Sequence, residues 1–185
     1  MIFFFLYKII FLNNYKIQQK TTYYYVSILS RKQKSFQRGK IMNYEINEGT
    51  LAVLPSNEKS KVLEDKKEYE INSTPYEIMD YSCKYFGSSY EGRKEGTKAI
   101  LDINYKVPII VENSKNIIFF PTNSPSAKDC CWISLKNIKQ IKEEEYNTTK
   151  IIFNNDISIL IPVSKRTIEN QILRASRLDL IMRDR

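Results

Sequence analysis

The stretch TPYEIMDYSCKYFGSSYEGRKEGT, residues 74–97, joins a helix-start signature to a glycine-rich run. Thr74 offers a side-chain oxygen to cap a helix, the proline after it suits the first helical position, and Glu77 completes a capping box. Apolar residues then recur at helical spacing. Gly87 stands where a helix commonly ends in the left-handed conformation. The first half of the stretch therefore predicts a helix over residues 75–86.

The glycine-rich half approaches a phosphate-binding loop without matching one. Gly87 and Gly92 have the separation that the G-x-x-x-x-G-K-[ST] template requires. Arg93 stands where that template has lysine, and Lys94 stands where it has the hydroxyl that binds magnesium. A helix, and not a strand, is expected before the run. These departures disfavour a nucleotide hydrolase.

The same run still suits contact with a polyanion. We expect a flexible, hydroxyl-lined bend whose glycines let backbone amides approach phosphate, with a further helical turn or two over residues 97–101. The candidate contacts are Ser88, Ser89, Arg93, Lys94 and Lys98, with Lys84 one turn back on the preceding helix. A solvated surface loop that binds nothing is the alternative interpretation.

Short strand-like segments surround this stretch. Alternating or apolar runs bounded by turn residues predict strands over residues 44–47, 50–55, 68–71, 107–111, 117–121, 150–153 and 157–161, and a strand or strand pair over residues 131–141. Residues 56–67 are polar and are expected to form a loop with a weak strand. Ser164 caps a second helix over residues 164–182. The pattern predicts one α+β domain over residues 42–185, an antiparallel sheet of short strands and hairpins with about two packed helices.

The basic excess of the chain lies in residues 1–41. The net charge is +8, and this segment holds every unbalanced cation and no Asp or Glu. Its cations are Lys8, Lys16, Lys20, Arg31, Lys32, Lys34, Arg38 and Lys40. The remaining residues carry 21 basic and 21 acidic side chains, since eight of the 29 Lys and Arg lie in the leader. Any case for nucleic-acid binding by the body must therefore be local.

Three interpretations of this leader stay open. Its opening apolar run is interrupted by Lys8 and is shorter than the ~20 residues that span a bilayer. It could be a membrane or targeting segment, a disordered or apolar basic arm, or a non-native extension upstream of a true start at Met42. We predict the last, because the codons of residues 38–41 permit a purine-rich, ribosome-binding-like stretch before that methionine.

Catalysis and metal binding find little support. The sequence contains no His and three Cys, which cannot supply four nitrogen and sulfur ligands to zinc. Cys83, Cys130 and Cys131 also lack a histidine base, so we interpret them as packing thiols of a cytoplasmic protein. We expect no cofactor, no small-molecule substrate and no membrane partner.

The C-terminal helix is a second basic candidate. Its charged residues are Lys165, Arg166, Arg174, Arg177, Arg183 and Arg185 against Glu169, Asp179 and Asp184. Arg174 and Arg177 lie one turn apart, and a basic helix face can lie along DNA. A merely solvated face and a subunit interface are the alternatives.

Five motifs occur in a familiar order. They are residues 44–55 (YEINEGTLAVLP), 80–97 (DYSCKYFGSSYEGRKEGT), 119–122 (FFPT), 130–134 (CCWIS) and 169–171 (ENQ). Together they resemble the ComK family, the competence transcription factors of low-GC Gram-positive bacteria. The resemblance extends from about Tyr44 to Arg177. Cys131 departs from the family, which tends to have Gly there, and longer members continue beyond the final helix, so functions of that tail are not carried over.

The resemblance implies a sequence-specific DNA-binding activator and not an enzyme. Family members act as oligomers on paired AT-rich boxes, largely through the minor groove, and switch on DNA-uptake genes. An adaptor that delivers them to a Clp protease holds them in check. The implied ligand of Arg93 and Lys94 is then the DNA backbone and minor groove, since a narrow A-tract groove attracts cations. The rival hypothesis is a non-DNA-binding interaction protein, or an inactive truncated paralogue that modulates a longer competence factor.

Overall fold

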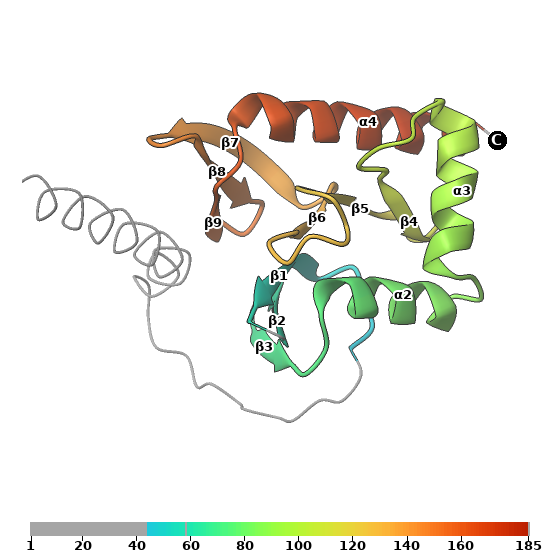
Figure 1. The fold of residues 1–185 in the computed structure, drawn as a ribbon, viewed down its shortest axis with the longest axis horizontal. Helices are drawn as coiled ribbons and strands as arrows, with labels where there is room; N and C mark the ends of the chain where they lie inside the picture. Colours follow the sequence, from blue (N-terminus) through green and yellow to red (C-terminus); the bar gives the residue numbers. More distant parts are fainter. Residues whose placement is uncertain (1–43, 58, 185) are drawn as a thin grey trace, which may run out of the picture.

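The structure is a computed structural model that describes residues 44–57 and 59–184 (Figure 1). The leader of residues 1–41 and the proposed start at Met42 lie outside the described residues, so their interpretation stays a prediction. None of the helices in the part that is described is both long and apolar enough to cross a bilayer.

Two antiparallel sheets form the β part of the fold. The larger sheet has the strand order β3-β2-β1-β6-β5-β4 and the smaller has the order β7-β8-β9. The strands are β1 (Thr50–Ser56), β2 (Lys59–Glu64), β3 (Glu68–Ile71), β4 (Ile109–Glu112), β5 (Ile117–Pro121), β6 (Trp132–Ser134), β7 (Ile138–Glu144), β8 (Thr148–Phe153) and β9 (Ser158–Ile161). The predicted α+β class is confirmed, with two sheets in place of one.

The helices differ from the prediction in number. They are α2 (Pro75–Tyr85), α3 (Tyr90–Leu101) and α4 (Lys165–Arg183). The two predicted helices are confirmed as α2 and α4. Thr74 forms the expected capping box with Glu77, and Gly87 has a φ of 77°. Ser164 caps α4 by accepting a hydrogen bond from the Thr167 amide.

The prediction of a flexible bend over the glycine-rich run was wrong, because residues 90–101 form helix α3. Ser89 caps this helix by accepting a hydrogen bond from the Gly92 amide at 3.0 Å. Two interior glycines cost a helix up to about 1 kcal/mol each. Burial of Tyr90, Thr97 and Leu101 against the rest of the fold offsets that cost.

One strand prediction near the start of the body was also wrong. The segment of residues 44–47 pairs with no strand, but it is fastened to the fold by side chains. The Tyr44 hydroxyl donates to the Glu64 carboxylate at 2.6 Å, and the Ile46 amide donates to the Ser82 hydroxyl of α2 at 3.0 Å. The weak strand expected within the polar residues 56–67 is present as β2, whose buried residues include Val62.

The six-stranded sheet is covered on both faces. Alternate residues of β5 show this, since Phe119 packs in one hydrophobic cluster with α2 and Phe120 packs in another with α4 and the small sheet. In Figure 1, α2 and α4 lie on opposite sides of the molecule, and α3 crosses from one to the other. The arrangement brings α3, α4 and the segment between α3 and β4 together.

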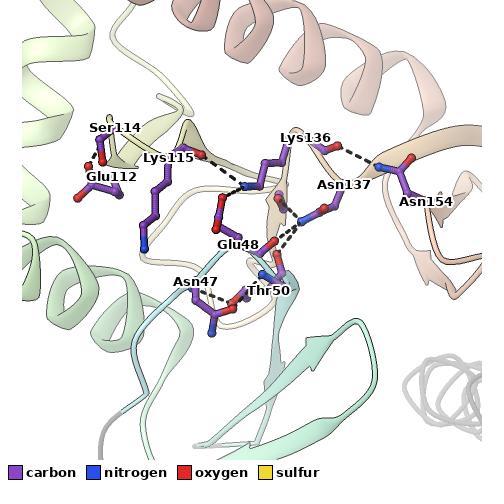
Figure 2. A network of polar contacts seen from close by, with 11 residues as sticks. Asn47, Glu48, Thr50, Glu112, Ser114, Lys115, Lys136, Asn137 and Asn154 are labelled. Atoms are coloured by element: carbon purple, nitrogen blue, oxygen red, sulfur yellow. Dashed lines mark hydrogen bonds and ion pairs between the residues drawn. The ribbon is translucent and has the colours of Figure 1, made fainter.

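A polar network fastens the small sheet to the large one (Figure 2). The side-chain amide of Asn137, just before β7, donates to the Thr50 carbonyl at 3.1 Å and to the Glu48 carbonyl at 3.3 Å. The Asn154 side chain, in the turn after β8, donates to the Lys136 carbonyl at 3.1 Å. These bonds hold the two sheets together, and α4 follows the small sheet directly in the chain.

Candidate nucleic-acid interface

The backbone amides at the corner of α2 and α3 are already bonded within the chain. The Tyr90 amide donates to the Asp80 carboxylate at 3.2 Å, and Ser89 is occupied as the cap of α3. The pKa of Asp80 lies below its ordinary value, because the carboxyl accepts hydrogen bonds from Lys84 and from the Tyr90 amide. A carboxylate therefore stands at the helix N-terminus where a phosphate was expected.

The Arg93 side chain points toward the protein interior and not into solvent. Its Nη2 lies 3.4 Å from the Phe86 carbonyl at the end of α2, and its Nε is buried without a hydrogen-bond partner in the described chain. The pKa of Glu112 in β4 is lowered mainly by hydrogen bonds from Ser114 and in smaller part by the Arg93 charge. Arg93 thus lies between α2 and β4, with only part of its side chain at the surface.

The predicted lysines are held in ion pairs. Lys84 pairs with Asp80 at 2.6 Å, Lys94 with Glu91 at 2.8 Å and Lys98 with Glu95 at 2.8 Å. Lys94 also lies 5.9 Å from the centre of the Tyr90 ring. Each pair cancels most of the local charge, so these lysines add little net positive potential. Ser88 is half-buried at the same corner.

Lys106, Arg174 and Arg177 are among the cations that form no ion pair with an acidic side chain of the described residues. Lys106 donates to the Thr122 carbonyl at 3.0 Å and lies 5.5 Å from the centre of the Tyr105 ring. Arg174 donates to the Tyr105 carbonyl at 2.9 Å. Arg177 is exposed one turn further along α4. Because their contacts are neutral or with solvent, these side chains retain their full charge.

Gln171 holds this arrangement in place. Its buried side-chain amide donates to the Pro121 carbonyl at 2.7 Å and to the Lys106 carbonyl at 3.0 Å, and its oxygen accepts from Arg174 at 3.3 Å. The amide therefore joins α4 to the end of β5 and to the segment after α3. Sequence reasoning placed Gln171 only in the ENQ motif of the family resemblance and missed Lys106, which belongs to no recognisable pattern.

A groove of about 360 Å³ is lined in part by Lys106. The side chains that line it include Tyr76, Tyr90, Lys94, Tyr105, Lys106 and Ser124. The predicted Lys94 and the missed Lys106 therefore face the same groove, and Arg174 contacts the segment that forms its edge. We call Lys94, Lys106, Arg174 and Arg177 the basic surface. Ammonium, guanidinium and hydroxyl groups are the side chains that most often contact DNA phosphates.

The cysteines do not contribute to this surface. Burial raises the pKa of Cys83 to about 12 and that of Cys130 to about 11, and it raises the pKa of Cys131 as well. No group of three or more Cys, Asp or Glu side chains in residues 44–57 and 59–184 could hold a metal ion.

Burial predicts that the thiols are unreactive in the folded protein. A thiol reagent at neutral pH should modify all three cysteines about a hundredfold or more slowly in buffer than in denaturant, because only exposed thiolates react. Labelling followed by intact mass measures this. Rapid labelling of Cys83 without denaturant would contradict its placement in the core between α2 and the large sheet.

Comparison with known proteins agrees with the resemblance seen in the sequence. The family model described as ComK protein matches residues 41–185. The competence transcription factor of Bacillus subtilis (strain 168) is 39% identical over 147 residues, which cover 77% of this chain and 77% of that protein. No solved structure matched. The family model spans most of the chain, and the relative is 39% identical over 77% of it. The chain therefore belongs to the ComK family.

Proposed function

We propose that this protein is a sequence-specific DNA-binding transcriptional activator of competence genes, which binds AT-rich duplex DNA through the basic surface. Membership of the ComK family and the name of the Bacillus subtilis relative support a regulator of transcription. The observation that carries the proposal is the placement of Lys106 and Arg174 at one segment without acidic partners in the described chain, with Arg177 exposed one turn further along α4.

The side chains of the basic surface suit contact with the sugar–phosphate backbones of a DNA duplex. Lys106 and Arg174 are fixed by neutral carbonyl groups, so binding a phosphate breaks no ion pair of theirs. Cations that neutralise phosphates release condensed counterions, which drives binding and makes it depend on salt. Arg177 is free to extend from α4, and a narrow A-tract minor groove attracts arginine. Lys94 adds a contact once phosphate competes with Glu91.

The other predicted contacts receive different roles in this proposal. Arg93 braces the end of α2, and Ser89 caps α3. Lys84, Lys98 and Ser88 lie outside the basic surface as defined here. The paired AT-rich boxes, the homo-oligomeric state, the cytoplasmic location and control by an adaptor of a Clp protease are proposed from the family resemblance alone.

Salt-dependent binding tests the proposal. Lys106→Ala and Arg177→Ala should each lower the slope of log affinity against log salt concentration by about one, because each change removes one phosphate contact. Fluorescence anisotropy on a duplex with two A-tract/T-tract boxes, repeated at several salt concentrations, measures the slope.

Lys139→Ala is the matched control for this experiment. Lys139 is exposed on β7 and pairs with Asp156, so the substitution removes a surface lysine away from the basic surface. Its slope should equal that of the unaltered protein. Unchanged slopes in both Lys106→Ala and Arg177→Ala would remove the basic surface from the interface.

The rival function, a non-DNA-binding partner of a longer competence factor, has one observation in its favour. Leu173 and Leu180 are exposed on the outer side of α4, where a protein partner could bind. A mobility shift on the same duplex separates the two functions, since the rival binds no DNA at any salt concentration.

A further inference from the structure

The outer face of α4 carries two leucines that are mostly exposed in the described chain. Leu173 and Leu180 are 68% and 61% exposed, and every other exposed large hydrophobic side chain in the described residues is a tyrosine. The inner face of α4 buries a separate stripe of Ile168, Gln171, Ala175 and Leu178. Figure 1 shows the sheets and α3 on one side of α4 only, which leaves the opposite face uncovered.

The exposed stripe has the spacing of a coiled-coil seam. The stripe consists of Glu169, Leu173, Ser176, Leu180 and Arg183. Successive members are four, three, four and three residues apart. This is the interval that keeps side chains facing a second helix. The order is also symmetric about its middle, with a small residue at the centre, a leucine on each side and opposite charges at the two ends.

We propose that α4 pairs with α4 of a second copy of this chain, antiparallel about a twofold axis at Ser176. In that register Glu169 is level with Arg183 of the second copy, and Leu173 lies one residue, about 1.5 Å along the helix axis, from the level of Leu180. Each contact then occurs twice, as a twofold interface requires. A parallel pair would place Glu169 against Glu169 and Arg183 against Arg183, so charge complementarity selects the antiparallel arrangement.

The charges at the ends are available for this contact. Glu169 forms one long ion pair, in which its carboxylate lies 3.5 Å from the Lys165 ammonium group. Arg183 donates from Nε and Nη2 to Asp179 at 2.9 and 2.8 Å, and its guanidinium has further N–H groups for a second carboxylate. Ser176 at the centre lets the two helix axes approach closely. Glu169 and Arg183 can therefore pair between the two copies without breaking an ion pair within α4.

The pairing has a geometric consequence for the proposed DNA surface. Arg174 and Arg177 occupy one flank of α4, between the buried stripe and the exposed stripe. In an antiparallel pair with this axis, the same flanks of both helices lie on one side. The dimer would thus present two basic surfaces in one direction, which suits a site made of two half-sites. Only this consequence depends on the proposed function.

Charge exchange tests the pairing directly. In the full chain, Glu169→Arg and Arg183→Glu should each weaken the dimer about tenfold or more, because each brings like charges together. Mixing the two variants should restore association, since each charged contact is then complementary. The double variant should also pair with itself. Sedimentation equilibrium without DNA, over a wide range of protein concentration, measures the dimer.

A second variant removes the apolar contacts. Leu173→Glu with Leu180→Glu should weaken the dimer about a hundredfold or more, because it loses two buried leucine pairs. Both side chains are exposed in the single chain, so circular dichroism should show an unchanged fold. Tyr85→Glu on α2 is the control for a charge placed at an exposed apolar site, and it should leave the dimer intact.

Three outcomes would overturn the pairing. They are a protein that stays monomeric at every concentration, a dimer that survives the double leucine substitution, and charge variants that do not recover on mixing. Because the measurement contains no DNA, its failure leaves the salt-slope experiment unaffected, and the reverse also holds.

Discussion

Replacing Trp132 by alanine is expected to lower the free energy of unfolding by about 3–5 kcal/mol. The indole is fully buried in β6, between β1 and β5 of the large sheet. Its ring meets that of Tyr90 at 5.9 Å and 84°, and Tyr90 is the first residue of α3 and lines the groove. Urea denaturation followed by circular dichroism measures the loss, because the substitution removes the single tryptophan and its fluorescence.

Trp132→Phe separates packing from polarity at the same position. The indole Nε1 is buried with no hydrogen-bond partner in the described chain. Phenylalanine keeps most of the apolar contact and removes that unpaired N–H, so the loss should be only about 1–2 kcal/mol. A loss in Trp132→Ala no larger than in Trp132→Phe would show that the indole does not fill the core as described.

Replacing Gln171 by leucine is expected to lower both stability and DNA affinity. The change keeps the volume but leaves the Pro121 and Lys106 carbonyls without their donor and removes an acceptor from Arg174. The free energy of unfolding should fall by about 2–4 kcal/mol, since each buried carbonyl left unpaired costs about 1–3 kcal/mol. Affinity for the AT-rich duplex should fall about tenfold at low salt, because Lys106 and Arg174 lose their fixed positions.

Two further variants locate the cause of that effect. Asn72→Leu makes the same kind of change at an exposed amide after β3 and should alter neither quantity. Gln171→Glu also removes the donors and in addition places a carboxylate beside Arg174, so it should impair stability and lower the DNA affinity at least as much as Gln171→Leu. Binding is compared at a temperature where circular dichroism shows each variant folded. A Gln171→Leu protein that is less stable but binds normally would exclude Gln171 from organising the interface.

Local signals account for most of the confirmed secondary structure. The capping box at Thr74 and the cap at Ser164 involve residues three positions apart, so the sequence displays them directly. The hairpins β4–β5 and β8–β9 join strands across short polar turns, which are equally local. Only the last turns of helix α3, residues 97–101, were predicted, because two glycines lower the propensity of its first part and tertiary burial makes the helix favourable there.

The candidate site depends on contacts that no local pattern encodes. Lys106 and Gln171 are 65 residues apart in the chain, yet one hydrogen bond joins them. Ion pairs within α3 also reduce the positive charge that two of the predicted DNA contacts offer. Glu91 pairs with Lys94 and Glu95 with Lys98, because the helix brings residues three apart together. Lys106 and Arg174 instead donate to carbonyl groups of distant segments, namely those of Thr122 and Tyr105.

The amino-acid sequence by itself determined the α+β class, the ends of α2 and α4, the strands of the later hairpins and the resemblance to one family. These properties arise from caps, turns and periodic burial, whose physical causes act over a few residues. The tertiary structure alone decided that the glycine-rich run is a helix, that Arg93 points inward and that Lys106 lies beside Arg174 of α4. Which charges remain uncompensated depends on distances between segments, and folding of the whole domain sets those distances.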